Sequence, residues 1–235
     1  MSLISLGSLG RSRVRVTTND SVRTSSASSL AYRFGKRAID IAGASFGLLV
    51  LCPVFAALAI LVRLDSKGSA FHRRRVLAEQ AGAEGDLVTF DAFKFRTMVQ
   101  DADTYLQSRP ELLQEYQKEY KLLQDPRVTR IGAPLRRFSL DELPQLWNVL
   151  CGQMSLVGPR MITPPELAQY GQHADRLLSV KPGLTGLWQV SGRTNLSYND
   201  RVGLDMHYIE NRSLAMDIKI LFQTIGCVLG GKGAV

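Results

Sequence analysis

The longest apolar stretch of the chain runs from Ile41 to Val62 and reads IAGASFGLLVLCPVFAALAILV, without a charged side chain. About 22 residues, at about 1.5 Å per residue in a helix, just suffice to cross a hydrocarbon core of about 30 Å. A helix buried in a soluble core is the alternative, but few soluble helices are apolar on every side. The pattern therefore predicts a membrane-associated helix.

A proline and the flanking charges argue against a simple span. Pro53 follows Cys52 in the middle of the stretch, where it removes a helical hydrogen bond and predicts a bend at these two residues. Basic residues flank both ends of the stretch, and basic flanks stay on the cytoplasmic side of a membrane. A re-entrant helix that enters one leaflet, bends and returns satisfies both observations. A strained single span is the alternative.

Shorter patterns follow the apolar stretch. Residues 86–98 alternate apolar and polar side chains as a strand does, and strong helix formers follow, with a break near Pro110. We also expect a β-like stretch within 125–138, a helix ending near Leu150, a strand over 187–190 and helices over 198–211 and 214–229. The fold class is then α/β: an N-terminal re-entrant, Pro-kinked membrane helix joined to a mostly helical cytosolic domain with a small sheet and interfacial helices.

The same patterns divide the chain into four parts. The first thirty residues are rich in Ser, Thr and Arg and lack the apolar run of a secretory signal. We expect a disordered basic tail (1–31), the re-entrant helix (32–66), a cytosolic catalytic domain (67–229) and a flexible C-terminal tail (230–235).

Composition adds a preference for anionic partners. The net charge is +8, which suits phosphorylated substrates, an anionic membrane surface or nucleic acid. We expect no nucleic-acid partner, because the basic residues follow no motif of that kind. The three cysteines have neither metal-ligand nor redox spacing, so we expect reduced thiols.

The segment LRRFSLDELPQLWNVLCGQMSLVGPR, residues 135–160, carries the candidate chemistry. Ser139 and Glu142 match a capping box, so the adjacent Asp141 and Glu142 could simply start a helix. Pro144 disfavours that start, because it cannot donate to the carbonyl of Leu140. The alternative places the two carboxylates at a junction before the helix.

The surroundings of this carboxylate pair favour phosphate chemistry. Arginines at 136, 137, 160 and 193 offer bidentate donors for phosphate oxygens. Proteins hold Mg²⁺ through one or two carboxylates together with substrate phosphates, and a carboxylate can itself attack phosphorus. The residues alone therefore predict a membrane-associated enzyme that handles phosphate groups.

Five motifs in order carry a resemblance to a known family. They are KRAIDIAG, the apolar stretch with its central proline, FKFRTM, the carboxylate segment above, and KPGLTGLWQVSGR followed by LDMHYIENRSLAMDIKILFQTI. Over about residues 36–225 the chain resembles the bacterial sugar transferase family, the monotopic polyprenol-phosphate phosphoglycosyl transferases. It is most similar to the members that initiate exopolysaccharide synthesis with galactose or glucose.

The resemblance implies a reaction and a setting. A hexose-1-phosphate would move from a UDP-sugar to undecaprenyl phosphate, releasing UMP, in the bacterial inner membrane with the catalytic domain facing the cytoplasm. The implied partners are the UDP-sugar, undecaprenyl phosphate and membrane lipid; a homodimer is compatible with the resemblance. The implied cofactor is Mg²⁺, or Mn²⁺.

Residue roles follow from the same resemblance. Asp141 is expected to be the nucleophile, forming a covalent phosphosugar intermediate, and Glu142 its partner in metal and proton handling, so both are expected metal ligands. The expected phosphate-binding residues are Arg136, Arg160, Arg193, Lys94 and Arg96. Cys52 stands where the family usually has a serine before Pro53, so the bend would depend more on the proline.

Two other functions share features with this one. A glycosidase needs carboxyl groups that face each other across the sugar, and adjacent residues cannot do so. A non-catalytic membrane scaffold of a polysaccharide assembly complex is the stronger alternative, since it would also suit a basic chain with a membrane helix.

Overall fold

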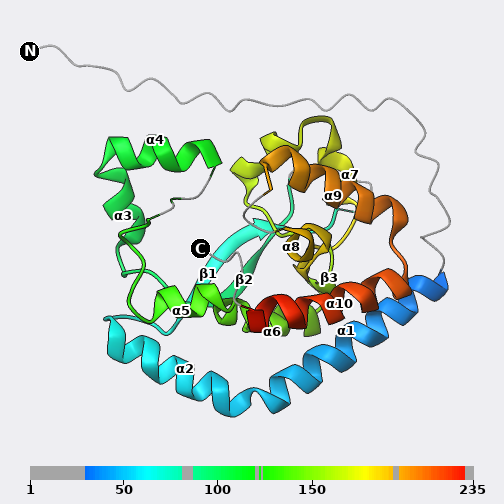
Figure 1. Ribbon diagram of the computed structural model, residues 1–235, viewed down its shortest axis with the longest axis horizontal. Helices are drawn as coiled ribbons and strands as arrows, with labels where there is room; N and C mark the ends of the chain where they lie inside the picture. The colour runs from blue at the N-terminus through cyan, green and yellow to red at the C-terminus, as the bar shows by residue number, and fades with distance from the viewer. Residues whose placement is uncertain (1–29, 81–86, 120–121, 123, 193–195, 231–235) are drawn as a thin grey trace, which may run out of the picture.

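A bent pair of helices forms one side of the molecule (Figure 1). The computed structural model describes residues 30–80, 87–119, 122, 124–192 and 196–230. Helix α1 (Leu30–Val50) and helix α2 (Cys52–Asp65) meet at an angle of 62°. Pro53 lies in the first turn of α2, where a missing backbone N–H costs no hydrogen bond. The bend predicted at Cys52 and Pro53 is confirmed.

This pair is also the only membrane candidate within the described residues. No single helix there is long and apolar enough to cross a bilayer, whereas α1 and α2 together meet that requirement as a broken span or a re-entrant loop.

The rest of the chain folds into short helices and two small sheets. Strand β1 pairs with β2 in antiparallel fashion, His72 opposite Lys94, and β3 pairs with β4 in parallel. In chain order the elements are β1 (Phe71–Leu77), β2 (Thr89–Phe95), α3 (Ala102–Gln107), α4 (Pro110–Glu119), α5 (Gly132–Arg137), the 3₁₀ turn η2 (Leu140–Glu142), α6 (Gln145–Leu150), β3 (Ser155–Val157), η3 (Pro164–His173), α7 (Ala174–Leu178), β4 (Gly183–Thr185), α8 (Leu187–Ser191), α9 (Tyr198–Asn211) and α10 (Leu214–Gly230).

Two sequence expectations need correction, and one strand was missed. The strand expected over 187–190 is helix α8, and the strand lies just before it, at β4. Leu187 and Val190 both pack against the main core, which the spacing of one helical turn permits and strand alternation does not. Helix α5 takes up the later part of the β-like stretch expected within 125–138, and the earlier part holds one bridge, between Val128 and Met98. Strand β1 was not predicted, because its run of arginines hides the alternation.

Helix α1 is fastened to the domain by buried polar contacts. Lys36 donates to the carboxylate of Asp217 on α10 (2.9 Å) and to the carbonyl of Val157 on β3 (2.8 Å). Tyr208 on α9 donates to the same Asp217 carboxylate (2.7 Å). One turn further along α1, Asp40 accepts hydrogen bonds from the Ser155 hydroxyl and a β3 amide. The first half of the bent pair is therefore fixed against β3, α9 and α10.

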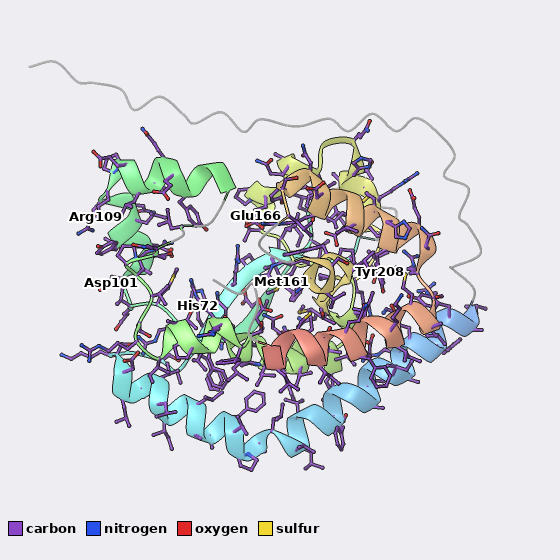
Figure 2. All side chains as sticks on the ribbon, in the orientation of Figure 1. His72, Asp101, Arg109, Met161, Glu166 and Tyr208 are labelled. Carbon is purple, nitrogen blue, oxygen red and sulfur yellow. The ribbon has the colours of Figure 1, made fainter. Side chains whose placement is uncertain are left out.

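The outer face of the bent pair stays apolar and exposed. Side chains project from α1 and α2 away from the domain (Figure 2), and α10, which packs along α1, adds further exposed apolar residues. They include Leu30, Phe34, Phe46, Leu49, Ile60, Leu64, Phe222, Ile225 and Leu229. An apolar surface of this extent on one side of a protein marks an interaction face.

Candidate active site

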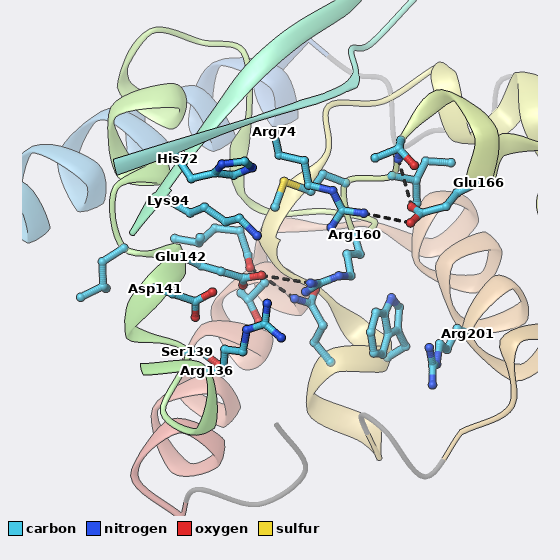
Figure 3. Close-up of a pocket in the computed structure, with 18 of the residues that line it drawn as sticks. His72, Arg74, Lys94, Arg136, Ser139, Asp141, Glu142, Arg160, Glu166 and Arg201 are labelled. Carbon is cyan, nitrogen blue, oxygen red and sulfur yellow. Dashed lines mark hydrogen bonds and ion pairs between the residues drawn. The ribbon is translucent and has the colours of Figure 1, made fainter. Parts of the chain in front are cut away.

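A cleft of about 770 Å³ opens above the bent pair, between the β1–β2 ribbon, the turn η2 and helices α8 to α10. Charged side chains gather in it (Figure 3). Asp141 and Glu142 come from η2, Lys94 from β2, Arg136 from α5 and Arg160 from the loop after β3, and all five line the cleft. Three separate stretches of the chain, namely β2, the α5–η2 stretch and the loop after β3, thus deliver two carboxylates and three cations to one place.

The carboxylate pair lies on a turn and not on a regular helix. Ser139 has a left-handed backbone (φ 55°) and makes no capping hydrogen bond with its side chain. The 3₁₀ turn η2 follows, and α6 begins only after Pro144. The capping box is therefore absent, and the junction interpretation is confirmed. The turn directs Asp141 and Glu142 into the cleft.

Asp141 is buried and electrostatically unusual. Only 8% of its surface is exposed. Burial, and next the neighbouring charge of Glu142, raises the pKa of Asp141 to about 6, while Lys94, Arg136 and Arg160 oppose the shift. The carboxylate is thus mostly ionised at neutral pH yet more basic than an ordinary aspartate. That combination suits a nucleophile toward phosphorus.

Arg160 is held by a close approach of two backbones. It pairs with Gly183 in an isolated bridge, and the amide of Gly183 donates to the carbonyl of Pro159 (2.7 Å). A Cβ on Gly183 would lie 2.1 Å from the amide nitrogen of Gly158, so only glycine fits there. The guanidinium of Arg160 then donates to the Glu142 carboxylate at 3.0 Å. The glycines of the VGPR and KPGLTG segments therefore aim this arginine at the carboxylate pair.

The other two cations are held by their own contacts. Arg136 donates through Nε to the hydroxyl of Thr97 (2.9 Å). Lys94 is half-buried, and burial together with the charge of Arg74 lowers its pKa to about 8. Lys94 is therefore still largely protonated at neutral pH.

The cleft also contains cations that sequence reasoning missed. Arg74 donates to Glu166 (3.0 Å), whose other oxygen accepts from the amide of Thr163. Arg201 lies at the far end of the cleft, next to Trp188. Neither residue carried a signal in the sequence, because Arg74 lies in the arginine run that hides strand β1 and Arg201 lies among ordinary helix residues.

Two predicted phosphate ligands are not brought into the cleft. Arg96 is buried and donates to the carbonyls of Ser66, Lys67 and Ser69, at 2.6 to 2.7 Å. Its guanidinium closes the turn after α2, so Arg96 is not among the residues that line the cleft. Arg193 lies outside the described residues.

The two carboxylates could hold a divalent ion together with substrate phosphates. No group of three or more potential ligands among His, Cys, Asp and Glu gathers anywhere in the described residues. Burial, and next the charge of Glu142, raises the pKa of Asp141, so a cation beside the two carboxylates would be favoured. Two carboxylates with room for substrate phosphates match the way proteins hold Mg²⁺ and do not form a complete protein cage.

Comparison with known proteins decides the family. The sequence profile described as "Bacterial sugar transferase" matches residues 31–231, which include every element of the cleft. The chain belongs to the bacterial sugar transferase family. Both the resemblance drawn from the five motifs and the mostly helical fold with a small sheet are confirmed.

Relatives within this bacterial sugar transferase family are closely similar. The chain is 43% identical over 203 residues to "Exopolysaccharide production protein ExoY" of Sinorhizobium fredii, covering 85% of this chain and 87% of that one. It is 44% identical over 206 residues to a "UDP-galactose-lipid carrier transferase" of Erwinia amylovora and 43% identical over 206 residues to an "Undecaprenyl-phosphate galactose phosphotransferase" of Salmonella typhimurium. Each match covers 86% of this chain but only 42% of the relative, so the chain spans less than half the length of these two proteins.

Proposed function

We propose that this chain transfers a hexose-1-phosphate from a UDP-sugar to undecaprenyl phosphate, the first step of exopolysaccharide or related glycan synthesis. The names of the similar transferases support the acceptor and the type of transfer. The observation that carries the proposal is the buried Asp141 carboxylate, directed into a cleft whose other charged groups are placed to hold phosphate.

In the first half-reaction, an oxygen of Asp141 attacks the phosphorus bonded to the sugar. The bond from this phosphorus to the oxygen bridging the two phosphates breaks, and UMP leaves with that electron pair. Lys94, Arg136 and Arg160 stabilise the charge that accumulates on the phosphate oxygens. Asp141 now carries the phosphosugar as an acyl phosphate.

In the second half-reaction, an oxygen of the lipid phosphate attacks the same phosphorus. The acyl phosphate bond breaks, the Asp141 carboxylate is regenerated, and the product is a lipid diphosphate sugar. Both displacements occur at phosphorus, so the sugar keeps its anomeric configuration. The pairing of Glu142 with Arg160 keeps that guanidinium beside the reacting group in both steps.

Asp141 and Glu142 would hold a Mg²⁺ or Mn²⁺ ion, which when bound supplies charge neutralisation for the diphosphate. The chain's own residues bind and orient the phosphates around that position. Arg160 and Glu142 hold each other, and Lys94 contributes a cation whose burial limits its hydration.

The proposed location is the cytoplasmic face of the inner membrane. We propose that α1 and α2 enter one leaflet as a re-entrant pair, with the exposed apolar residues of α10 at the interface. The acceptor's long hydrocarbon chain would then remain in the bilayer while its phosphate reaches the cleft directly above.

Intact-mass spectrometry of the purified protein with UDP-sugars, Mg²⁺ and no lipid acceptor tests the mechanism. We expect a mass increase equal to one hexose phosphate less one water with the preferred donor, an equal amount of released UMP, and neither with Asp141→Asn. Turnover without such an adduct would favour direct transfer in a ternary complex. No turnover with any donor, after undecaprenyl phosphate is added to folded protein in lipid, would favour the membrane scaffold.

A further inference from the structure

The cleft contains a second cationic position that the proposed mechanism does not use. In Figure 3, Arg201 lies on the opposite side of Arg160 from Asp141. Arg201 belongs to the first turn of α9, and its guanidinium carbon lies 5.2 Å from the centre of the Trp188 ring. Arg160 lies 5.9 Å from the same ring. A single indole therefore contacts both the arginine that serves the carboxylate pair and a second one further away.

The two arginines differ in their partners. Arg160 is paired with Glu142, whereas Arg201 forms no ion pair within the described residues, and its Nε is buried there without a hydrogen-bond acceptor. The neighbouring carboxylate of Asp200 is occupied with the Ser197 cap of α9. A half-buried guanidinium that the described chain leaves uncompensated calls for an anion from outside.

The surroundings restrict what that anion can be. The aromatic ring holds the planar guanidinium in place, an arrangement suited to bidentate contact with phosphate oxygens. Helix α10 also lines the cleft, through Leu221, Thr224 and Val228, and the Thr224 hydroxyl lies 2.7 Å from that of Thr185. A phosphate ester with an apolar or flat substituent fits such a site better than a free carboxylate.

We propose that Arg201, held against Trp188, forms a second phosphate-binding subsite of the cleft, remote from Asp141. The inference rests on the proposed function only for the two phosphates that could occupy the subsite, the nucleotide phosphate of the donor or of UMP, and the phosphate of the polyprenyl acceptor. With two subsites, one phosphate can be held at Arg201 while the other reacts at Asp141.

Binding and half-reaction measurements on Arg201→Gln test this subsite. UMP and a short-chain polyprenyl phosphate are titrated separately into the full chain in detergent. Loss of one charge-assisted contact predicts about 10- to 100-fold weaker binding of the phosphate that occupies the subsite. Weaker UMP binding with a slower adduct-forming step assigns the subsite to the nucleotide. Weaker lipid phosphate binding with a higher KM for the acceptor, and an unchanged adduct-forming step, assigns it to the acceptor.

Matched variants separate a binding role from a structural one. Arg109 also stacks on an aromatic ring, 3.6 Å from the centre of Tyr105, but lies away from the cleft, so Arg109→Gln should change neither affinity. Arg201→Lys keeps the charge and should restore part of the affinity, and Trp188→Phe keeps a ring and should lose less than Trp188→Leu. Unchanged affinity for both phosphates in folded Arg201→Gln, judged by its melting curve, overturns the proposal. Because binding is measured directly, the subsite can stand even if the chain transfers no sugar.

Discussion

Two clusters of charged residues in this protein differ in how completely their charges are paired within the chain. Between α1, α9 and α10, Lys36 and Asp217 pair with each other, and Tyr208 and a β3 carbonyl complete the set. In the cleft, no residue of the described chain donates a hydrogen bond to the Asp141 side chain, and its pKa is raised to about 6. The first cluster is complete within the chain and fixes a helix. The second is incomplete in a way that a phosphorylated ligand would complete.

Asp141→Asn should produce the largest effect on turnover. We expect UMP release to fall by about a thousandfold or more, since the nucleophile is removed. The melting temperature should stay the same or rise, because the ionised form of this buried carboxylate is unfavourable to the fold above pH 6. A parallel loss of stability would place Asp141 with the structural cluster instead.

Asp217→Asn should show the reverse behaviour. Breaking a buried ion pair leaves Lys36 uncompensated and should cost about 3 kcal/mol of unfolding free energy, measured by thermal or urea denaturation. Asp175→Asn, a change of the same type at an exposed site on α7, is the control and should cost far less. The folded fraction of Asp217→Asn should retain near-normal turnover, and a selective loss of turnover at full stability would contradict this division.

Lys94 and Arg96 test the same contrast within one motif. Lys94→Gln removes a cation from the cleft and should lower turnover about tenfold to a hundredfold with little loss of stability. Arg96→Gln breaks three hydrogen bonds to the turn after α2 and should lower the melting temperature while the folded protein keeps its kcat. Steady-state kinetics beside melting curves distinguish the two. The comparison would fail if both variants behaved alike.

The pH dependence of adduct formation should report the protonation of the charged groups in the cleft. The rate should fall as the pH drops through about 6, where the carboxylate pair takes up a proton, and again as it rises through about 8, where Lys94 loses its charge. Glu142→Gln removes a negative neighbour of Asp141, so the acid limb should move to lower pH. An acid limb that moves upward in this variant would mean that Glu142 does not raise the pKa of Asp141.

Glu210→Gln should have the smallest effect. Glu210 pairs with Arg176 on the surface, where both side chains are about half exposed. Removing an exposed pair changes stability by about 0.5 kcal/mol or less. Chemical denaturation against wild type, repeated at high salt, measures the difference. A cost as large as that of Asp217→Asn would show that exposure does not separate these pairs.

The sequence predicted the features that neighbouring residues determine, and it missed those that depend on tertiary packing. The bend at Pro53 follows from proline chemistry, and Pro144 alone predicted that the carboxylate pair lies on a turn. Arg96 and Lys94 were indistinguishable in sequence, because only the packing of α2 against β2 turns Arg96 toward backbone carbonyls. Arg201 was missed for the same reason, since its neighbour Trp188 is brought to it by the fold.

The position of Trp188 between two arginines has an optical consequence. The chain has two tryptophans, and the other, Trp147, lies on α6 with 54% of its surface exposed. Trp147 should therefore contribute a red-shifted emission that does not depend on what the cleft holds. Trp188 is buried against two guanidinium groups. A phosphate bound in the cleft would neutralise their charge, so the quantum yield of Trp188 should change on binding. The fold thus provides its own fluorescent indicator of occupancy, readable in real time without a label.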